Sequence, residues 1–76
     1  MTTLGEQRVR VSFNPSGNTE VNDIKRRAAD CIDWCEDHKQ RDATKSLNVS
    51  EVNRMLALAQ TAFEEAAMWA VKSVTG

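Results

Sequence analysis

A few aromatic and basic side chains in the N-terminal half are the residues that could hold an anionic ligand. Phe13 offers a ring on which a nucleobase could stack, because every base has a π-face. Lys25 and Arg26 belong to the run Lys25-Arg26-Arg27, which can supply charge-assisted hydrogen bonds to phosphate. The alternative for this run is a solvated helix face with an Asp23–Arg27 pair. The alternative for Phe13 is an anchor that holds the N-terminal segment on the core.

Two polar residues stand among apolar neighbours in the C-terminal half. Arg54 precedes Met55 and Leu56 near the start of a predicted helix, where the helix dipole disfavours a cation. An anionic ligand would offset that mismatch. Thr61 is a further candidate because its neighbours along the chain are mostly apolar.

Cys31, Cys35 and His38 share one face of a predicted helix and are zinc-competent residue types. Their spacing is also that of the apolar stripe, buried free cysteine is common, and a fourth ligand is not evident. Core packing is therefore favoured over metal binding. With one histidine, no Gly-x-Ser-x-Gly motif and no glycine-rich phosphate loop, the sequence predicts no enzymatic activity and no cofactor.

Length and charge limit the possible classes of protein. The 76 residues allow one domain, residues 1–76, with too small a core for easy independent stability, so oligomerisation is expected. The net charge of −1 argues against DNA binding, although residues 8–27 are locally basic. No apolar run approaches the roughly 20 residues of a membrane span. Without a secretory signal, the two cysteines are expected to be reduced cytosolic thiols.

The periodicity predicts an all-α fold, an antiparallel two-helix hairpin preceded by an extended arm. Residues 1–7 have no periodicity and are expected to be mobile, residues 8–13 alternate polar and apolar side chains like a strand without a partner, and residues 14–18 form a turn. Residues 1–17 are thus the arm and turn. The first helix spans 18–41, with Asn18 or Thr19 as N-cap. Its apolar stripe comprises Val21, Ile24, Ala28, Cys31 and Cys35, widened by Ile32.

The second helix is predicted at 48–74. Asn48 is the expected N-cap with Glu51 reaching back to it, and Leu47 and Val52 form a hydrophobic staple. A seam that can pack on the first helix recurs at steps of three and four: Val52, Leu56, Ala59, Phe63, Ala66 and Ala70. A second apolar face comprises Met55, Leu58, Ala62 and Trp69. One partner helix cannot cover both faces, so this second face is expected to meet another copy of the chain.

The residues from Asn53 to Lys72, with Met68-Trp69-Ala70-Val71 as the most specific part, resemble the helical-hairpin domain of phage anti-CBASS cyclic-nucleotide sponges, which anti-Thoeris sponges share. The segment Phe13 to Gly17, followed by Ile24-Lys25, is also similar to that family. The resemblance covers about residues 9–74. It implies a homo-oligomer, typically a hexamer, in the host bacterial cytoplasm. It also implies that cyclic dinucleotides such as cyclic GMP-AMP, and in some members cyclic trinucleotides at separate sites, bind without being cleaved.

Residue by residue, the resemblance implies that Phe13 stacks on a base and that Lys25 lies near a phosphate. The family often has Tyr where this chain has Phe13, so a hydroxyl contact would be lost. Asn14 and Arg54 match positions associated with the trinucleotide site, whereas Arg26 and Thr61 are candidates from the residues alone. The competing hypothesis is an oligomeric helical-hairpin interaction protein whose apolar second face docks a partner protein.

Overall fold

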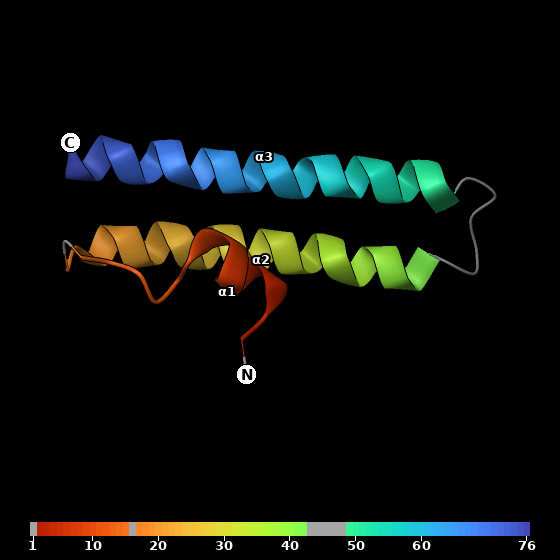
Figure 1. Ribbon diagram of the computed structural model, residues 1–76, viewed down its shortest axis with the longest axis horizontal. Helices are drawn as coiled ribbons and strands as arrows, with labels where there is room; N and C mark the ends of the chain where they lie inside the picture. Colours follow the sequence, from red (N-terminus) through yellow and green to blue (C-terminus); the bar gives the residue numbers. More distant parts are fainter. Residues whose placement is uncertain (1, 16, 43–48) are drawn as a thin grey trace.

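Three helices make up the fold in the computed structural model, which describes residues 2–15, 17–42 and 49–76. A short helix α1 spans Leu4–Val9, and the long helices α2 and α3 span Thr19–Asp42 and Val49–Thr75. The two long helices lie side by side and antiparallel, and α1 lies near the middle of α2 (Figure 1). No strand occurs in these ranges. The predicted all-helical hairpin is therefore confirmed.

Local signals account for the start of α2. The backbone N–H of Glu20 donates to the Asn18 side-chain oxygen at 2.8 Å, so Asn18 is the N-cap. Each long helix begins and ends one residue after its predicted limits. The predicted cap Asn48 and the staple residue Leu47 lie outside the described residues. Glu51 instead forms an ion pair with Arg54, one turn further along α3.

The extended arm predicted for residues 1–17 is wrong for its first half, because residues 4–9 form α1. A capping box begins this helix: the Thr3 side chain accepts from the Glu6 N–H, and the Glu6 carboxylate accepts from the Thr3 N–H. Thr3-x-x-Glu6 is the sequence signal that reveals α1. A six-residue helix is marginal alone, so packing must stabilise it.

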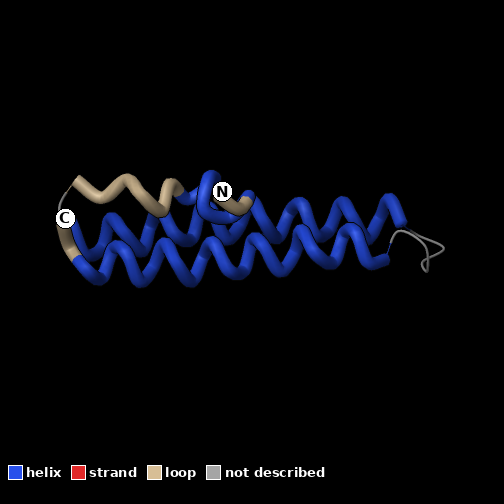
Figure 2. Tube along the Cα trace, turned by 90° about the horizontal axis from the view of Figure 1, so that it is seen from below, coloured by secondary structure: helices blue, strands red, loops and turns tan. Residues whose placement is uncertain are grey.

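The packing of α1 on α2 depends on a glycine. A Cβ at Gly5 would lie 2.1 Å from the carbonyl oxygen of Ala29, so only glycine permits this approach. The Gly5 N–H donates to the Asp33 side chain at 2.7 Å, and Arg26 of α2 pairs with Glu6 at 2.8 Å. Figure 2 shows α1 and the chain after it on one broad face of the hairpin. Residues 2–15 therefore form a layer on the hairpin.

This third element shifts the centre of burial on both long helices. In α2 the buried residues are Val21, Lys25, Ala29, Ile32 and Cys35, whereas Ile24, Ala28 and Cys31 of the predicted stripe are only partly buried. In α3, Gln60 and Ala67 are buried, and Ala66 of the predicted seam is exposed. The prediction considered only two helices. Contacts with Val9 and its neighbours displace both buried stripes toward α1.

Gln60 is buried because α2 satisfies its amide. Its Nε2 donates to the Ile32 carbonyl and to the Glu36 carboxylate, each at 3.1 Å, and its Oε1 accepts from Lys39 at 2.7 Å. A buried amide with all these partners fixes the register of α3 on α2. Among the described residues, no helix is both long and apolar enough to cross a membrane.

The outer face of α3 has no cover within one chain. Met55, Leu58, Met68 and Trp69 are each more than half exposed. The second apolar face predicted from the sequence is thus present and open, as a surface for self-association requires.

Candidate ligand-binding site

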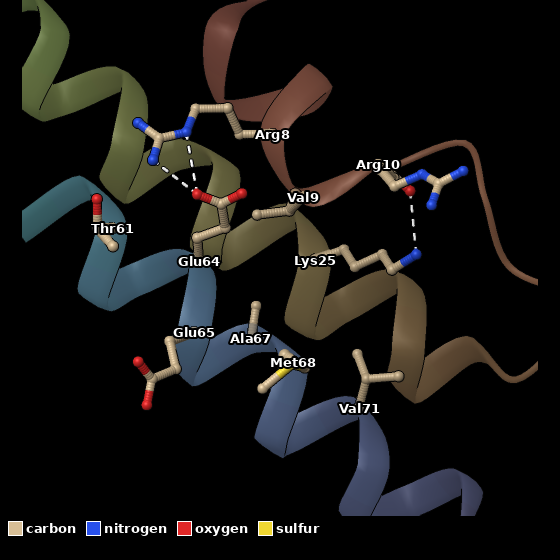
Figure 3. Close-up of a pocket in the computed structure, with 10 residues that line it drawn as sticks. All are labelled: Arg8, Val9, Arg10, Lys25, Thr61, Glu64, Glu65, Ala67, Met68 and Val71. Carbon is tan, nitrogen blue, oxygen red and sulfur yellow. Dashed lines mark hydrogen bonds and ion pairs between the residues drawn. The ribbon is translucent and has the colours of Figure 1, made fainter.

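A pocket of about 540 Å³ lies where the end of α1 meets α2 and α3. Its apolar lining comprises Val9, Ala67, Met68 and Val71. Figure 3 shows the Arg8–Glu64 ion pair at one end of the pocket, and Arg10 with Lys25 at the other. The pocket therefore combines an apolar floor with a cationic end.

Lys25 is the centre of the cationic end. Its side chain is buried, and its Nζ donates to the backbone carbonyls of Arg10, at 3.0 Å, and Phe13. These bonds fasten the chain after α1 to α2. Burial lowers the pKa of Lys25, and the charge of Arg10 lowers it further. An ammonium has three N–H donors, so one remains for an oxygen of a ligand.

Phe13 lies directly beside these cations. Its side chain is 52 % exposed, so it is not a buried anchor for the N-terminal segment. The Arg10 guanidinium lies 4.6 Å from the ring centroid and the Lys25 ammonium 5.4 Å. Both are cation–π distances, which hold the ring at the cationic end of the pocket.

Thr61 also reaches the pocket, from the side of α3. Its hydroxyl donates to the Ala57 carbonyl at 3.2 Å, which leaves its oxygen able to accept a hydrogen bond. Of the six predicted residues, Lys25 and Thr61 thus line the same pocket at opposite ends (Figure 3), and Phe13 lies beside Lys25.

The other three predicted residues hold partners within the chain. Asn14 donates from its amide to the Asn18 carbonyl and to the Asn22 side chain, so it shapes the turn before α2. Arg26 clamps α1 to α2 through Glu6 and also pairs with Asp30. Arg54 pairs with Glu51. A carboxylate of α3 itself therefore compensates the positive charge of Arg54, a role that was predicted from the sequence for an anionic ligand.

Charge pairing divides the basic side chains of the described residues into two groups. Most basic side chains in the described ranges hold a carboxylate: Arg8, Arg26, Arg27, Lys39 and Arg54. Arg10, Lys25 and Lys72 form no ion pair with a carboxylate of the described residues. The Lys72 ammonium lies over the Trp69 ring, 5.7 Å from its centroid, whereas Arg10 and Lys25 are neighbouring cations at one end of the pocket. Sequence reasoning counted Arg10 in the basic stretch but did not select it. Its left-handed backbone, with φ 57°, is a feature that only the fold reveals.

The cysteines and His38 do not form a ligand set in the structure. Cys35 is buried, and burial raises the pKa of its thiol, while the His38 ring stacks on Trp34 with centroids 3.6 Å apart. Within the part of the chain that the structure describes, no three His, Cys, Asp or Glu side chains gather closely enough to hold a metal ion. This face carries a separate apolar hollow of about 390 Å³ between α2 and α3, lined by Trp34, Leu56 and Phe63 among others.

Comparison with known families gives one match. The family model described as Acb2/Tad1, hairpin domain, matches residues 5–75. No curated protein and no solved structure matches the chain. The matched range includes all of α1 but Leu4, both long helices and the whole cationic end of the pocket.

Proposed function

The chain belongs to the Acb2/Tad1 hairpin-domain family of phage anti-CBASS and anti-Thoeris sponges, and we propose that it binds and sequesters a cyclic dinucleotide messenger of CBASS immunity. Cyclic GMP-AMP represents this ligand class. In this proposal, the protein acts by binding alone and releases the messenger chemically unchanged. Its place of action would be the cytoplasm of the infected bacterium, where such messengers are made.

The observation that carries this proposal is the pairing of Lys25 with Phe13. The Lys25 ammonium has no carboxylate partner among the described residues and keeps one free N–H, while an exposed ring lies 5.4 Å away. Phosphate is the natural acceptor for the first group and a nucleobase for the second. The apolar floor of the pocket can take the faces of a ribose or base, and Thr61 can accept a hydrogen bond.

In a symmetric dimer, Lys25 and Phe13 of each subunit would form one half of a binding site. A cyclic dinucleotide has two phosphates and two bases, so two subunits that each supply one Lys25 and one Phe13 would match its chemistry. The exposed side chains Leu58 and Trp69 on the outer face of α3 support self-association, because a solvated monomer rarely exposes so large an apolar face. We propose a homo-oligomer, with the hexamer of the family as the expected state.

The remaining candidates rank below Lys25, Phe13 and Thr61. A phosphate at Arg26 would have to displace Glu6, which would loosen α1. A phosphate at Arg54 would have to displace Glu51. Asn14 and Arg54 stay as proposed contacts for a cyclic trinucleotide at a separate site.

The alternative function is docking of a partner protein, and the apolar hollow beside Trp34 favours it. Its lining includes no residue of the layer formed by residues 2–15, so it is open to a partner helix. A chain with this function would keep an exposed apolar patch and would not respond to cyclic nucleotides.

Binding of cyclic GMP-AMP by purified protein tests the proposal. We expect saturable binding in calorimetry, a raised midpoint of thermal unfolding, and intact nucleotide after heat release, checked by chromatography. Lys25→Met, which keeps the apolar stem and removes the charge, should weaken binding. A hydrogen bond to a charged group contributes about 1.5–3 kcal/mol, which corresponds to roughly 10- to 150-fold.

The matched control is Arg27→Met on the same helix. Arg27 is exposed and pairs only with Asp23, so its loss should change the affinity by less than about twofold. If neither cyclic dinucleotides nor trinucleotides bind the folded wild-type protein, the sponge proposal is wrong and partner docking becomes the leading function.

A further inference from the structure

Arg10 occupies a backbone position that normally belongs to glycine. Its φ of 57° and ψ of 56° are left-handed, and it is the one non-glycine residue with positive φ in the described ranges. The turn that ends α1 has the Arg10 N–H on the Gln7 carbonyl at 3.3 Å and the Val11 N–H on the Glu6 carbonyl at 3.1 Å. This pattern of hydrogen bonds favours Gly, or Asn, at the position of Arg10. The backbone turn does not need the arginine side chain.

The side chain of Arg10 has no structural partner that would explain its presence. It forms no ion pair with a carboxylate in the described part of the chain, and its one contact of note is with the exposed ring of Phe13. Its positive charge also repels that of Lys25 and helps to lower the pKa of Lys25. The residue thus combines an unfavourable backbone with an unfavourable like-charge neighbour. Such combinations occur where function requires them.

An anion between Arg10 and Lys25 would offset the repulsion between the two cations and would raise the pKa of Lys25 again. The two side chains lie at the same end of the pocket, away from the carboxylate of Glu64, which Arg8 neutralises (Figure 3). A phosphate there would accept one hydrogen bond from the free N–H of Lys25 and one or two from the Arg10 guanidinium. It would also lie beside Phe13, as a stacked nucleotide requires.

We propose that Arg10 is a second phosphate-binding residue of this site, which binds the same phosphate as Lys25 and positions the Phe13 ring for stacking. This inference rests on the proposed function and extends it. The planar guanidinium can bind two phosphate oxygens and contact the ring, which a lysine ammonium cannot do in the same geometry. Arg10 is therefore expected to contribute to affinity and not to the stability of the free protein.

Arg10→Asn separates these two roles, because asparagine tolerates the left-handed conformation. Without ligand, the variant should unfold at the wild-type temperature or slightly above it. Its affinity for cyclic GMP-AMP should fall about tenfold or more, and its binding should depend less steeply on salt concentration. Arg10→Gly is the second variant and should behave alike. Arg10→Lys should retain the salt dependence but lose part of the affinity.

The control is Arg27→Asn, an exposed cation that should leave affinity and salt dependence unchanged. Binding by Arg10→Asn and Arg10→Gly within twofold of wild type, while Lys25→Met still weakens it, would overturn the role of Arg10 and leave the proposed function intact. A marked fall in the unfolding temperature of both variants would also overturn it, since the guanidinium would then be structural. Failure of the wild type to bind would overturn both proposals together.

Discussion

Replacement of Gly5 by alanine should detach α1 from the hairpin. The new Cβ would lie 2.1 Å from the carbonyl oxygen of Ala29 and 2.7 Å from its carbonyl carbon, well inside ordinary contact distances of 3.4–4 Å. Both atoms belong to the backbone of a long helix, so they cannot rotate away as a side chain would. Helix α1 must therefore move by more than an ångström or separate.

The magnitude follows from what α1 loses. The hydrogen bond from the Gly5 N–H to the Asp33 carboxylate contributes about 1.5–3 kcal/mol. Burial of Val9 adds about 1.5–3 kcal/mol. Alanine gains about 1 kcal/mol over glycine in helix propensity, which offsets part of the loss. We expect a net destabilisation of roughly 2–5 kcal/mol.

Urea denaturation followed by circular dichroism measures this change, and hydrogen exchange of the amides of residues 7–11 locates it. Gln7→Ala is the matched control, since Gln7 is exposed on the same helix and gains propensity without a clash. Gly17→Ala is a second control: its φ of 68° makes alanine unfavourable by about 1–2 kcal/mol, although no atom lies within 4 Å of the new Cβ. Ligand binding should also weaken in Gly5→Ala, because α1 positions Arg10 and Phe13. If Gly5→Ala were as stable as wild type with protected amides in α1, the close approach of the two backbones would be refuted.

Three other perturbations test separate parts of the structure. Gln60→Leu should destabilise the protein by about 1–3 kcal/mol in urea denaturation, because Lys39 and the Ile32 carbonyl lose a buried partner. Thr61→Ala, at an exposed position, should have little effect. A Gln60→Leu variant as stable as wild type would contradict the role of Gln60 in fixing the register of α3 on α2. Hydrogen bonds from the Thr3 backbone N–H, the larger cause, and from Arg26 lower the pKa of Glu6 from 4.5 to about 2. The Glu6 carboxylate therefore contributes its full stabilisation above pH 4.5, and this stabilisation disappears as the pH falls toward 2. In Glu6→Gln the unfolding temperature should therefore depend less on pH in this window, and an unchanged acid profile would argue against the capping box. Leu58→Lys on the exposed face of α3 should dissociate the proposed oligomer in sedimentation, while Ser50→Lys should not; a monomeric wild type would refute self-association.

Part of the candidate site was accessible from the sequence. Phe13 and Lys25 were predicted as a base-stacking ring and a phosphate contact, and the structure places them side by side. Thr61 was selected because it is polar among apolar neighbours, and it lines the pocket. Arg26 was selected from the basic cluster, and Arg54 because the helix dipole disfavours a cation at its position and because it matches a position of the family. A sequence does not show that each already holds a carboxylate.

The sequence by itself determined the hairpin, because helix periodicity and the Asn18 cap are local properties that act within a few residues along the chain. The Thr3-x-x-Glu6 box is equally local, yet it stabilises a six-residue helix only when Gly5 brings it against Ala29. Only the tertiary structure decided that contact. It also decided which face of each long helix is buried, and that Arg10 and Lys25 would become neighbours without a carboxylate between them. Those outcomes depend on residues far apart in the chain, whose approach is determined by packing and not by local propensity.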